Sequence, residues 1–276
     1  MLNVKQNGIY IDATTGLGGH AEAVLQGIGT DGRLIGIDRD DEALQRVKKR
    51  LSDSRVTLMQ GNFSDMEHLL CTDGITAVDG VLFDLGVSSM QLRSPGRGFS
   101  FASDAVLDMR MDRNQKLSAF DVVSRYPENE LEKILREFGE ERLARKIAKA
   151  ITQGRERKRI ETCSELSKIV EKVYRVRGRI HPATRTFQAL RIAVNQELVQ
   201  LKKGLDASLN LLKQSGRLCV ISYHSLEDRI VKHFMADNAK KGLLRIMTKK
   251  PITPAPEELR MNPSSRSAKL RVAEKI

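Results

Sequence analysis

Asp79-Gly-Val-Leu-Phe-Asp-Leu-Gly-Val-Ser-Ser-Met-Gln91 joins a short apolar run to an acid and a tight polar turn. Val81-Leu-Phe83 has the composition of a buried strand, and Asp84 stands at its carboxyl end. In open α/β sheets, ligands bind beyond the carboxyl ends of the strands, so Asp84 is expected to point toward a binding site. The segment therefore predicts an α/β protein with a site at this edge of its sheet.

Strand and helix patterns alternate on both sides of this segment. Strands are expected at residues 8–12, 33–38, 56–60, 78–84 and 217–224. Helices are expected from the turn at 15–20 to about residue 27, at 41–51, at 186–201 and at 205–214, the last capped by Ser215-Gly216. This rhythm predicts a mostly parallel, Rossmann-like sheet with helices on both faces.

The rhythm stops for about a hundred residues in the middle of the chain. Residues 95–113 are rich in Gly, Ser, Asp and Arg and predict an ordered loop; helices are expected at about 126–136, 140–154 and 163–176, before a turn at 178–182. We therefore expect one α/β domain in two parts, 1–104 and 186–276, around a helical insertion at 105–185. The C-terminal part of the chain is proline-rich at 249–256 and basic at 262–271.

Charge and composition restrict the function classes. The chain of 276 residues has a net charge of +12, and residues 142–185 hold fourteen Lys and Arg against four acids. Such density favours binding of a polyanion over a merely solvated helix face. No apolar run is long enough for a membrane span. The three scattered cysteines indicate neither a disulfide framework nor a zinc site and suggest a reducing cytoplasm.

Two further strand ends point to a nucleoside cofactor. The turn from Asp12 to Ala21 contains Gly16, Gly18 and Gly19, which let the backbone approach a ligand at a helix N-terminus. This turn also fits a loose dinucleotide fingerprint, but the acid before it favours S-adenosylmethionine. Asp38 ends the second strand, where a carboxylate can accept both ribose hydroxyls, as in NAD sites too.

Asp84 is the residue that separates these possibilities. An acid at the end of the fourth strand can accept hydrogen bonds from the exocyclic amine of a nucleobase and aim its lone pair at a methyl donor, which is catalysis by orientation. DNA and RNA amino-methyltransferases share this arrangement. The aromatic residue that usually stacks on the base is missing here, so we expect stacking from Phe99, Phe101 or Tyr223.

Longer motifs recur in one known family. They include Gly8-Ile-Tyr-Ile-Asp-Ala-Thr-Thr-Gly-Leu-Gly-Gly-His20, Asp84-Leu-Gly-Val-Ser-Ser-Met-Gln-Leu92, Arg97-Gly-Phe-Ser-Phe101, His181-Pro-Ala-Thr-Arg-Thr-Phe-Gln-Ala-Leu-Arg191, Ile221-Ser-Tyr-His-Ser-Leu-Glu-Asp-Arg229 and Asn262-Pro-Ser-Ser-Arg-Ser-Ala-Lys-Leu-Arg271. In order and spacing, along nearly the whole chain, these closely resemble the bacterial 16S ribosomal RNA cytosine-N4 methyltransferases, called RsmH or MraW.

The resemblance implies a class I S-adenosylmethionine methyltransferase fold, with a helical insertion that helps hold RNA. It implies methylation of N4 of a cytosine in the decoding region of the small ribosomal subunit. It carries cofactor contacts to Gly18, Gly19, His20, Asp38, Phe63, Asp84 and Gln91. Candidate contacts to RNA are Arg185, Ser222, His224, Arg266, Lys269 and Arg271, with His224 more a positioning residue than a base. No metal is expected, and a homodimer is allowed.

Two rivals stay open at the level of sequence: a DNA amino-methyltransferase, and a non-catalytic RNA-binding factor in ribosome assembly. A nicotinamide dehydrogenase is a distant third, because no hydride-transfer acid–base pair is found. Family members usually begin with a His-x-Ser/Pro-Val segment before the first strand, whereas Met1 stands about eight residues ahead of it here. We therefore expect that the true start of the protein lies upstream of Met1 or that the chain is shortened. Either case bears on how the protein closes over its cofactor, and hence on activity.

Overall fold

The computed structural model describes residues 1–94, 96–174 and 180–276. The chain divides into two compact units. Residues 1–86 and 198–276 form the first, an α/β unit, and residues 87–197 form the second, a helical unit. The turn predicted at 178–182 lies partly outside the described ranges. Three of the basic residues counted above lie wholly outside them: Arg175, Arg177 and Arg179.

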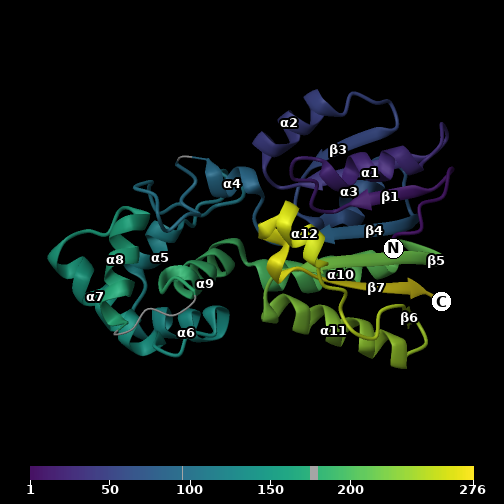
Figure 1. The fold of residues 1–276 in the computed structure, drawn as a ribbon. Helices are drawn as coiled ribbons and strands as arrows, with labels where there is room; N and C mark the ends of the chain where they lie inside the picture. Colours follow the sequence, from purple (N-terminus) through teal and green to yellow (C-terminus); the bar gives the residue numbers. More distant parts are fainter. Residues whose placement is uncertain (95, 175–179) are drawn as a thin grey trace. The chain divides into compact units, whose positions relative to one another are not determined.

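A seven-stranded sheet forms the centre of the α/β unit (Figure 1), in the order β3-β2-β1-β4-β5-β7-β6. The strands are β1 (Ile9–Asp12), β2 (Arg33–Asp38), β3 (Val56–Gln60), β4 (Val78–Asp84), β5 (Leu212–Ser222), β6 (Leu244–Ile246) and β7 (Lys269–Lys275). The first five run parallel, and β7 pairs antiparallel with both β5 and β6. The predicted α/β class with a mostly parallel sheet is confirmed.

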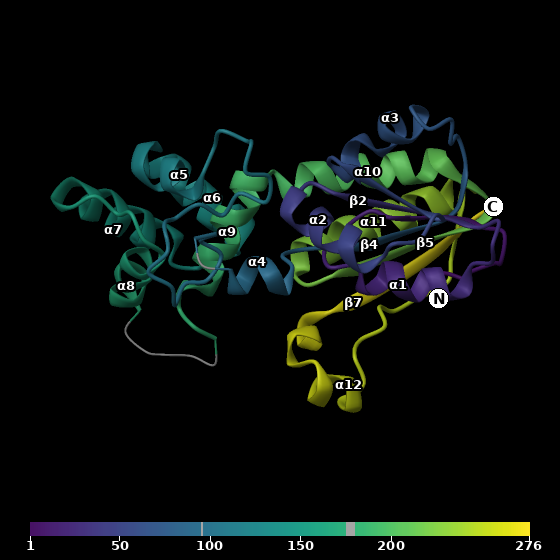
Figure 2. The same cartoon turned by 90° about the horizontal axis from the view of Figure 1, so that it is seen from above.

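Helices cover both faces of this sheet because successive side chains in a strand point to opposite sides. Tyr10 packs with the buried residues of α1, whereas its neighbour Ile11 packs with those of α3, α10 and α11. Figure 2 shows α1 and α10 on opposite sides of the sheet. The helices of this unit are α1 (Gly19–Gly27), α2 (Asp41–Arg50), η1 (Phe63–Asp65), α3 (Met66–Cys71), α10 (Glu197–Leu211), α11 (Ser225–Lys240), α12 (Pro256–Met261) and η2 (Pro263–Ser267).

Two predictions about the sequence before β5 are wrong. The helix expected at 186–201 is two helices, because Gln196 adopts a left-handed backbone (φ 50°) that ends α9 (Ala183–Asn195) before α10 begins. The cap expected at Ser215-Gly216 lies inside β5, where Ser215 also has a positive φ of 61° and the pairing register with β4 shifts. Pairing with β4 thus extends the strand back to Leu212.

The tail, basic at 262–271, runs into β7, which is an inner strand of the sheet. Its charged side chains are matched by partners on neighbouring elements. Arg271 pairs with Asp228 of α11, and Glu274 pairs with Arg217 and Arg245. Because buried charges are tolerated when they are paired, these contacts allow a charged sequence to occupy the sheet.

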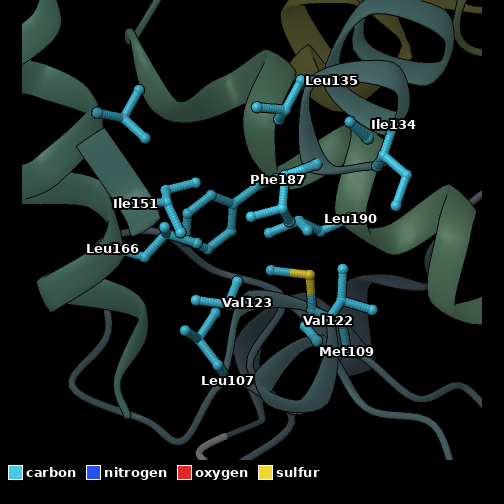
Figure 3. Close-up of a cluster of buried hydrophobic side chains, with 14 of the residues drawn as sticks. Leu107, Met109, Val122, Val123, Ile134, Leu135, Ile151, Leu166, Phe187 and Leu190 are labelled. Atoms are coloured by element: carbon cyan, nitrogen blue, oxygen red, sulfur yellow. The ribbon is translucent and has the colours of Figure 1, made fainter. Parts of the chain in front are cut away.

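The helical unit contains α4 (Ser89–Arg93), α5 (Ala119–Arg125), α6 (Glu128–Gly139), α7 (Ala144–Arg157), α8 (Cys163–Val173) and α9 (Ala183–Asn195). Its core joins side chains from α5 to α9 with Phe99, Leu107 and Met109 of the loop before α5. Figure 3 shows Leu107 and Met109 among these buried side chains. Because this loop and α9 share the core, the compact unit spans 87–197, wider than the expected 105–185. Across the described ranges, no helix has the length and apolarity needed to cross a membrane.

Candidate active site

Asp84 lies at the end of β4, between the strands β1 and β5. Register places it beside Ile221 of β5, while Asp12 at the end of β1 lies beside Leu82. The Asp84 amide N–H donates to Oγ1 of Thr14, 2.6 Å away, which ties the turn after β1 to the end of β4. The parallel topology thus brings the predicted strand ends together at one edge of the sheet.

Both oxygens of the Asp84 carboxylate have a neighbour within the α/β unit. The hydroxyl of Tyr223 donates to Oδ1 across 3.0 Å, and Nε2 of His20 lies 3.3 Å from Oδ2. The hydrogen bond with Asp84 is the main reason that the pKa of His20 is raised. Burial, and next the charge of Asp84, raises the pKa of the Tyr223 hydroxyl, so this group keeps its proton.

The glycine turn before α1 has the shape that the sequence predicts. Gly16 and Gly18 have positive φ values of 52° and 79°, which favour residues without a Cβ. A Cβ built on Gly19 would meet no atom within 4 Å, so the backbone there borders open space. This space at the start of α1 leaves room for a ligand to approach the main chain.

Asp38 organises the same turn from the end of β2. Its Oδ2 accepts the amide N–H of Gly16 across 2.7 Å, and its Oδ1 accepts that of Asp40 across 2.9 Å. Burial raises the pKa of this carboxyl group, although both backbone donors oppose the rise. Sequence reasoning assigned Asp38 to the ribose hydroxyls and did not foresee that its carboxylate also holds the glycine turn.

Asp12 carries the clearest sign of a ligand. Its side chain is buried; Oδ1 accepts the Thr14 amide N–H across 3.3 Å, whereas Oδ2 has no hydrogen-bond partner among the described residues. Burial raises the pKa of this carboxyl group to about 7. A buried acceptor without a donor is costly, so this oxygen suits a cationic or N–H-bearing ligand group such as an amino-acid ammonium.

Phe63, Ser222 at the end of β5 and His224 form local contacts in the same unit. Phe63 packs edge-to-face on Phe83 with ring centroids 5.3 Å apart. Ser222 is buried, and its hydroxyl donates to the carbonyl of Lys269. His224 caps α11: its Nδ1 accepts the Glu227 amide N–H, and its Nε2 lies 3.0 Å from the Glu227 carboxylate. Ser222 and His224 are therefore engaged in local structure.

The three basic candidates of the tail differ in exposure and in their contacts with Asp228. Arg271 is buried, and its Nε and Nη2 donate to the two oxygens of Asp228 at 2.6 and 3.2 Å. Lys269 is half-buried, with Nζ 3.5 Å from Asp228. Arg266 is exposed on η2 and stays a candidate.

Two predicted site residues belong to the helical unit. Gln91 is buried, and its Oε1 accepts the amide N–H of Ser88 in the capping box of α4. Arg185 lies on α9, where its Nη1 donates to the carbonyl of Glu140 across 3.4 Å. The structure places neither in the α/β unit that holds Asp84.

The structure shows the present contacts of the three aromatics that were expected to stack on the base. Phe99 is buried in the core of the helical unit, and the ring of Phe101 stacks on His181 with centroids 4.2 Å apart. Tyr223 offers its hydroxyl to Asp84, a contact that sequence reasoning missed. Sequence reasoning also missed that Thr14 accepts the Asp84 amide N–H. The signal that could have indicated it was the position of Thr14 two residues after Asp12, the acid that ends β1.

Comparison with known proteins supplies independent evidence on the family to which the chain is similar. A model of the MraW methylase family matches residues 1–276. A protein of Persephonella marina named "Ribosomal RNA small subunit methyltransferase H" is 52% identical over 280 residues, which cover 99% of this chain and 94% of the relative. A protein of the same name from Caldicellulosiruptor saccharolyticus is 49% identical over 292 residues, covering 100% and 95%.

Among solved structures, a protein from Clostridium thermocellum named as an rRNA methylase is similar with a TM-score of 0.50. The match covers 99% of this chain and 91% of that one, at 16% identity. At this identity the likeness concerns the fold alone. Together with the strand order and the antiparallel β7, it confirms the predicted Rossmann-like class I methyltransferase fold.

Proposed function

The chain belongs to the MraW methylase family, and from this premise we propose that it methylates N4 of a cytosine in the decoding region of small-subunit ribosomal RNA. It is a methyltransferase, and its cofactor is S-adenosyl-L-methionine. The observation that carries the choice of an amino group is the Asp84 carboxylate, which stands at the end of β4 with both oxygens oriented by neighbours.

Residues of the α/β unit fit the cofactor. When bound, S-adenosylmethionine supplies an electrophilic methyl group on its sulfonium sulfur. The unpaired Oδ2 of Asp12 suits its ammonium group, and the open backbone at Gly19 admits its methionine part. Asp38 would accept the ribose hydroxyls while its bonds to the Gly16 and Asp40 amides keep the carboxylate in place.

Asp84 would act on the substrate amine by orientation. The lone pair of a cytosine amine is delocalised into the ring, so the amine is a poor nucleophile. A hydrogen bond from N4–H to the Asp84 carboxylate turns the lone pair toward the methyl carbon and stabilises the positive charge that develops on nitrogen. Transfer would form the N4–methyl bond and break the bond between that methyl carbon and the sulfonium sulfur, which would keep the electron pair, and the surplus proton on N4 would leave to solvent. Tyr223 and His20 would hold the carboxylate still during this step.

The helical unit would contribute RNA affinity. Helix α7 carries exposed basic residues at Arg145, Lys146, Lys149 and Arg157, and Lys158 and Arg159 follow it. Phosphate contacts by such side chains give an affinity that falls steeply with salt. We propose the cytoplasm as the location and the small subunit or its RNA as the partner; a homodimer is compatible with this proposal.

The test is methyl transfer from labelled S-adenosylmethionine to small-subunit particles that lack the modification, with free RNA and DNA of the same sequence in parallel. We expect N4-methylcytidine in the digested RNA, and none with Asp84→Ala. The control variant, Asp206→Ala, removes an exposed acid of α10 and should retain activity. Product on DNA alone would identify a DNA enzyme; cofactor and RNA binding without transfer would identify a binding factor.

A further inference from the structure

A cavity of about 270 Å³ lies within the helical unit, between α5 and the C-terminal end of α7. Its lining residues are Phe120, Ser124, Arg125, Arg155, Glu156 and Arg159. Three guanidinium groups therefore border one hollow against a single carboxylate. All of these residues belong to the same unit, so their arrangement does not depend on the α/β unit.

Local contacts hold the three arginines in place. Nη1 of Arg155 donates to the carbonyl of Val123 in the last turn of α5, across 2.7 Å. The Arg159 guanidinium lies over the ring of Phe120, 4.6 Å from its centroid, and its Nε is 3.3 Å from Glu161. Arg125 pairs with Asp121 at 3.3 Å, one helical turn earlier.

These contacts leave donors for a ligand. A guanidinium has five N–H groups, and each of these contacts uses one nitrogen. The side chains of Arg125 and Arg159 are 75% and 68% exposed, so solvent reaches them. Asp121 also accepts the Ser118 hydroxyl, and Glu161 is 56% exposed. With Glu156 of the lining, three carboxylates face the three guanidinium groups, so the hollow offers directed N–H donors rather than an excess of charge.

We propose that this cavity binds a phosphodiester group of the RNA substrate. Arginine forks match the oxygens of a phosphate and are preferred where such groups are recognised. The Phe120 ring already carries Arg159 on one face, so the lining offers N–H donors more than a stacking surface. The proposal rests on the proposed RNA substrate and assigns the cavity a backbone contact without base specificity.

The experiment measures RNA binding and turnover of the full chain with Arg125→Gln, Arg159→Gln and the double variant. Both side chains are mostly exposed, so the fold should be retained, which thermal unfolding checks. We expect each single variant to raise KM for the RNA substrate several-fold, and the double variant about tenfold or more. The value of kcat and the affinity for S-adenosylmethionine should be unchanged.

Salt dependence separates a phosphate contact from a general loss. Each lost contact should lower the slope of log affinity against log salt by about 0.7–0.9. The matched control is Arg136→Gln, which removes a mostly exposed (62%) arginine of α6 that pairs with Glu132 one turn earlier, as Arg125 does with Asp121. Arg159→Lys keeps the charge without the fork and should recover only part of the affinity.

Two results would overturn the proposal: pocket variants that match Arg136→Gln in KM and salt slope, or variants that lower kcat while KM for RNA stays constant. Failure of the proposed function looks different, because wild-type protein would then transfer no methyl group to any RNA. RNA affinity itself, measured by direct titration, still reports on the cavity in that case.

Discussion

The hydroxyl of Tyr223 donates a hydrogen bond to Oδ1 of Asp84 across 3.0 Å, between residues 139 positions apart in the chain. The contact connects the residue after β5 to the end of β4, its neighbour in the sheet. With His20 near the other oxygen, it restricts rotation of the carboxylate that is proposed to receive the substrate amine. Orientation of that carboxylate is therefore a property of three separate segments.

Replacing Tyr223 with Phe should lower the rate without removing binding. A hydrogen bond to a charged group contributes about 1.5–3 kcal/mol, and a loss near the lower figure is about tenfold in rate. We expect kcat for Tyr223→Phe to fall about tenfold, with KM for RNA and cofactor affinity nearly constant. Single-turnover methyl transfer measures this; an unchanged rate would show that Asp84 is oriented without the hydroxyl.

The pKa of His20 should depend on the charge of Asp84. The hydrogen bond with Asp84 raises this pKa, so the pair contributes stability below the ordinary pKa of about 6.5 and loses it as pH rises through the folded-state value. Asp84→Asn should move the pKa of His20 back toward 6.5, as followed by NMR of the imidazole Cε1–H. Tyr223→Phe, which keeps the carboxylate, serves as control. A pKa that stays raised in Asp84→Asn would contradict the pairing.

Asp12 should make cofactor-free protein less stable toward neutral pH. Its pKa is about 7 in the folded chain because of burial, against about 3.9 when unfolded. The folded state therefore binds the proton more tightly, and the contribution of Asp12 is lost as pH rises from about 4 to 7. We expect Asp12→Asn to gain stability relative to wild type over this range, measured by denaturant unfolding at a series of pH values.

Asp53 provides the control for that measurement, because its pKa is lowered to about 2 by its hydrogen bond with Arg55. Its contribution is present above about pH 4 and is lost only at lower pH. The effect of Asp53→Asn should thus be constant between pH 5 and 7. A pH-independent effect of Asp12→Asn as well would refute the raised pKa of Asp12.

Asn195 should be a large contributor to the stability of the helical unit. Its buried amide accepts the N–H of Met111 across 2.9 Å and donates to the carbonyls of Met109 and Arg191. Met109 has a left-handed backbone (φ 60°), which these bonds hold. Asn195→Ala leaves buried backbone groups unpaired, so we expect a loss of about 2–3 kcal/mol in the free energy of unfolding.

Hydrogen exchange of the amides in 87–197, together with urea unfolding, measures this loss in the unit concerned. Asn210→Ala, at an exposed position of α10, is the control and should change stability by less than about 0.5 kcal/mol. Equal effects of the two substitutions would mean that the Asn195 network contributes little.

The sequence by itself determined the features that depend on local pattern. Apolar runs of strand length, glycines and acids at strand ends predicted β1 to β4, the turn at Gly16–Gly19 and the positions of Asp12, Asp38 and Asp84. These features repeat with short periods or occupy neighbouring positions. Composition and turn chemistry within a few residues are therefore enough to place them.

Tertiary structure alone decided the contacts between distant segments. It placed β7 between β5 and β6, paired Arg271 with Asp228, and brought the hydroxyl of Tyr223 to the Asp84 carboxylate. Each outcome depends on which side chains meet after the sheet has assembled, and long-range pairing outweighs local preference. A charged segment can thus become an inner strand once its charges have partners. The local periodicity of the sequence does not predict this, because the partners lie on distant segments.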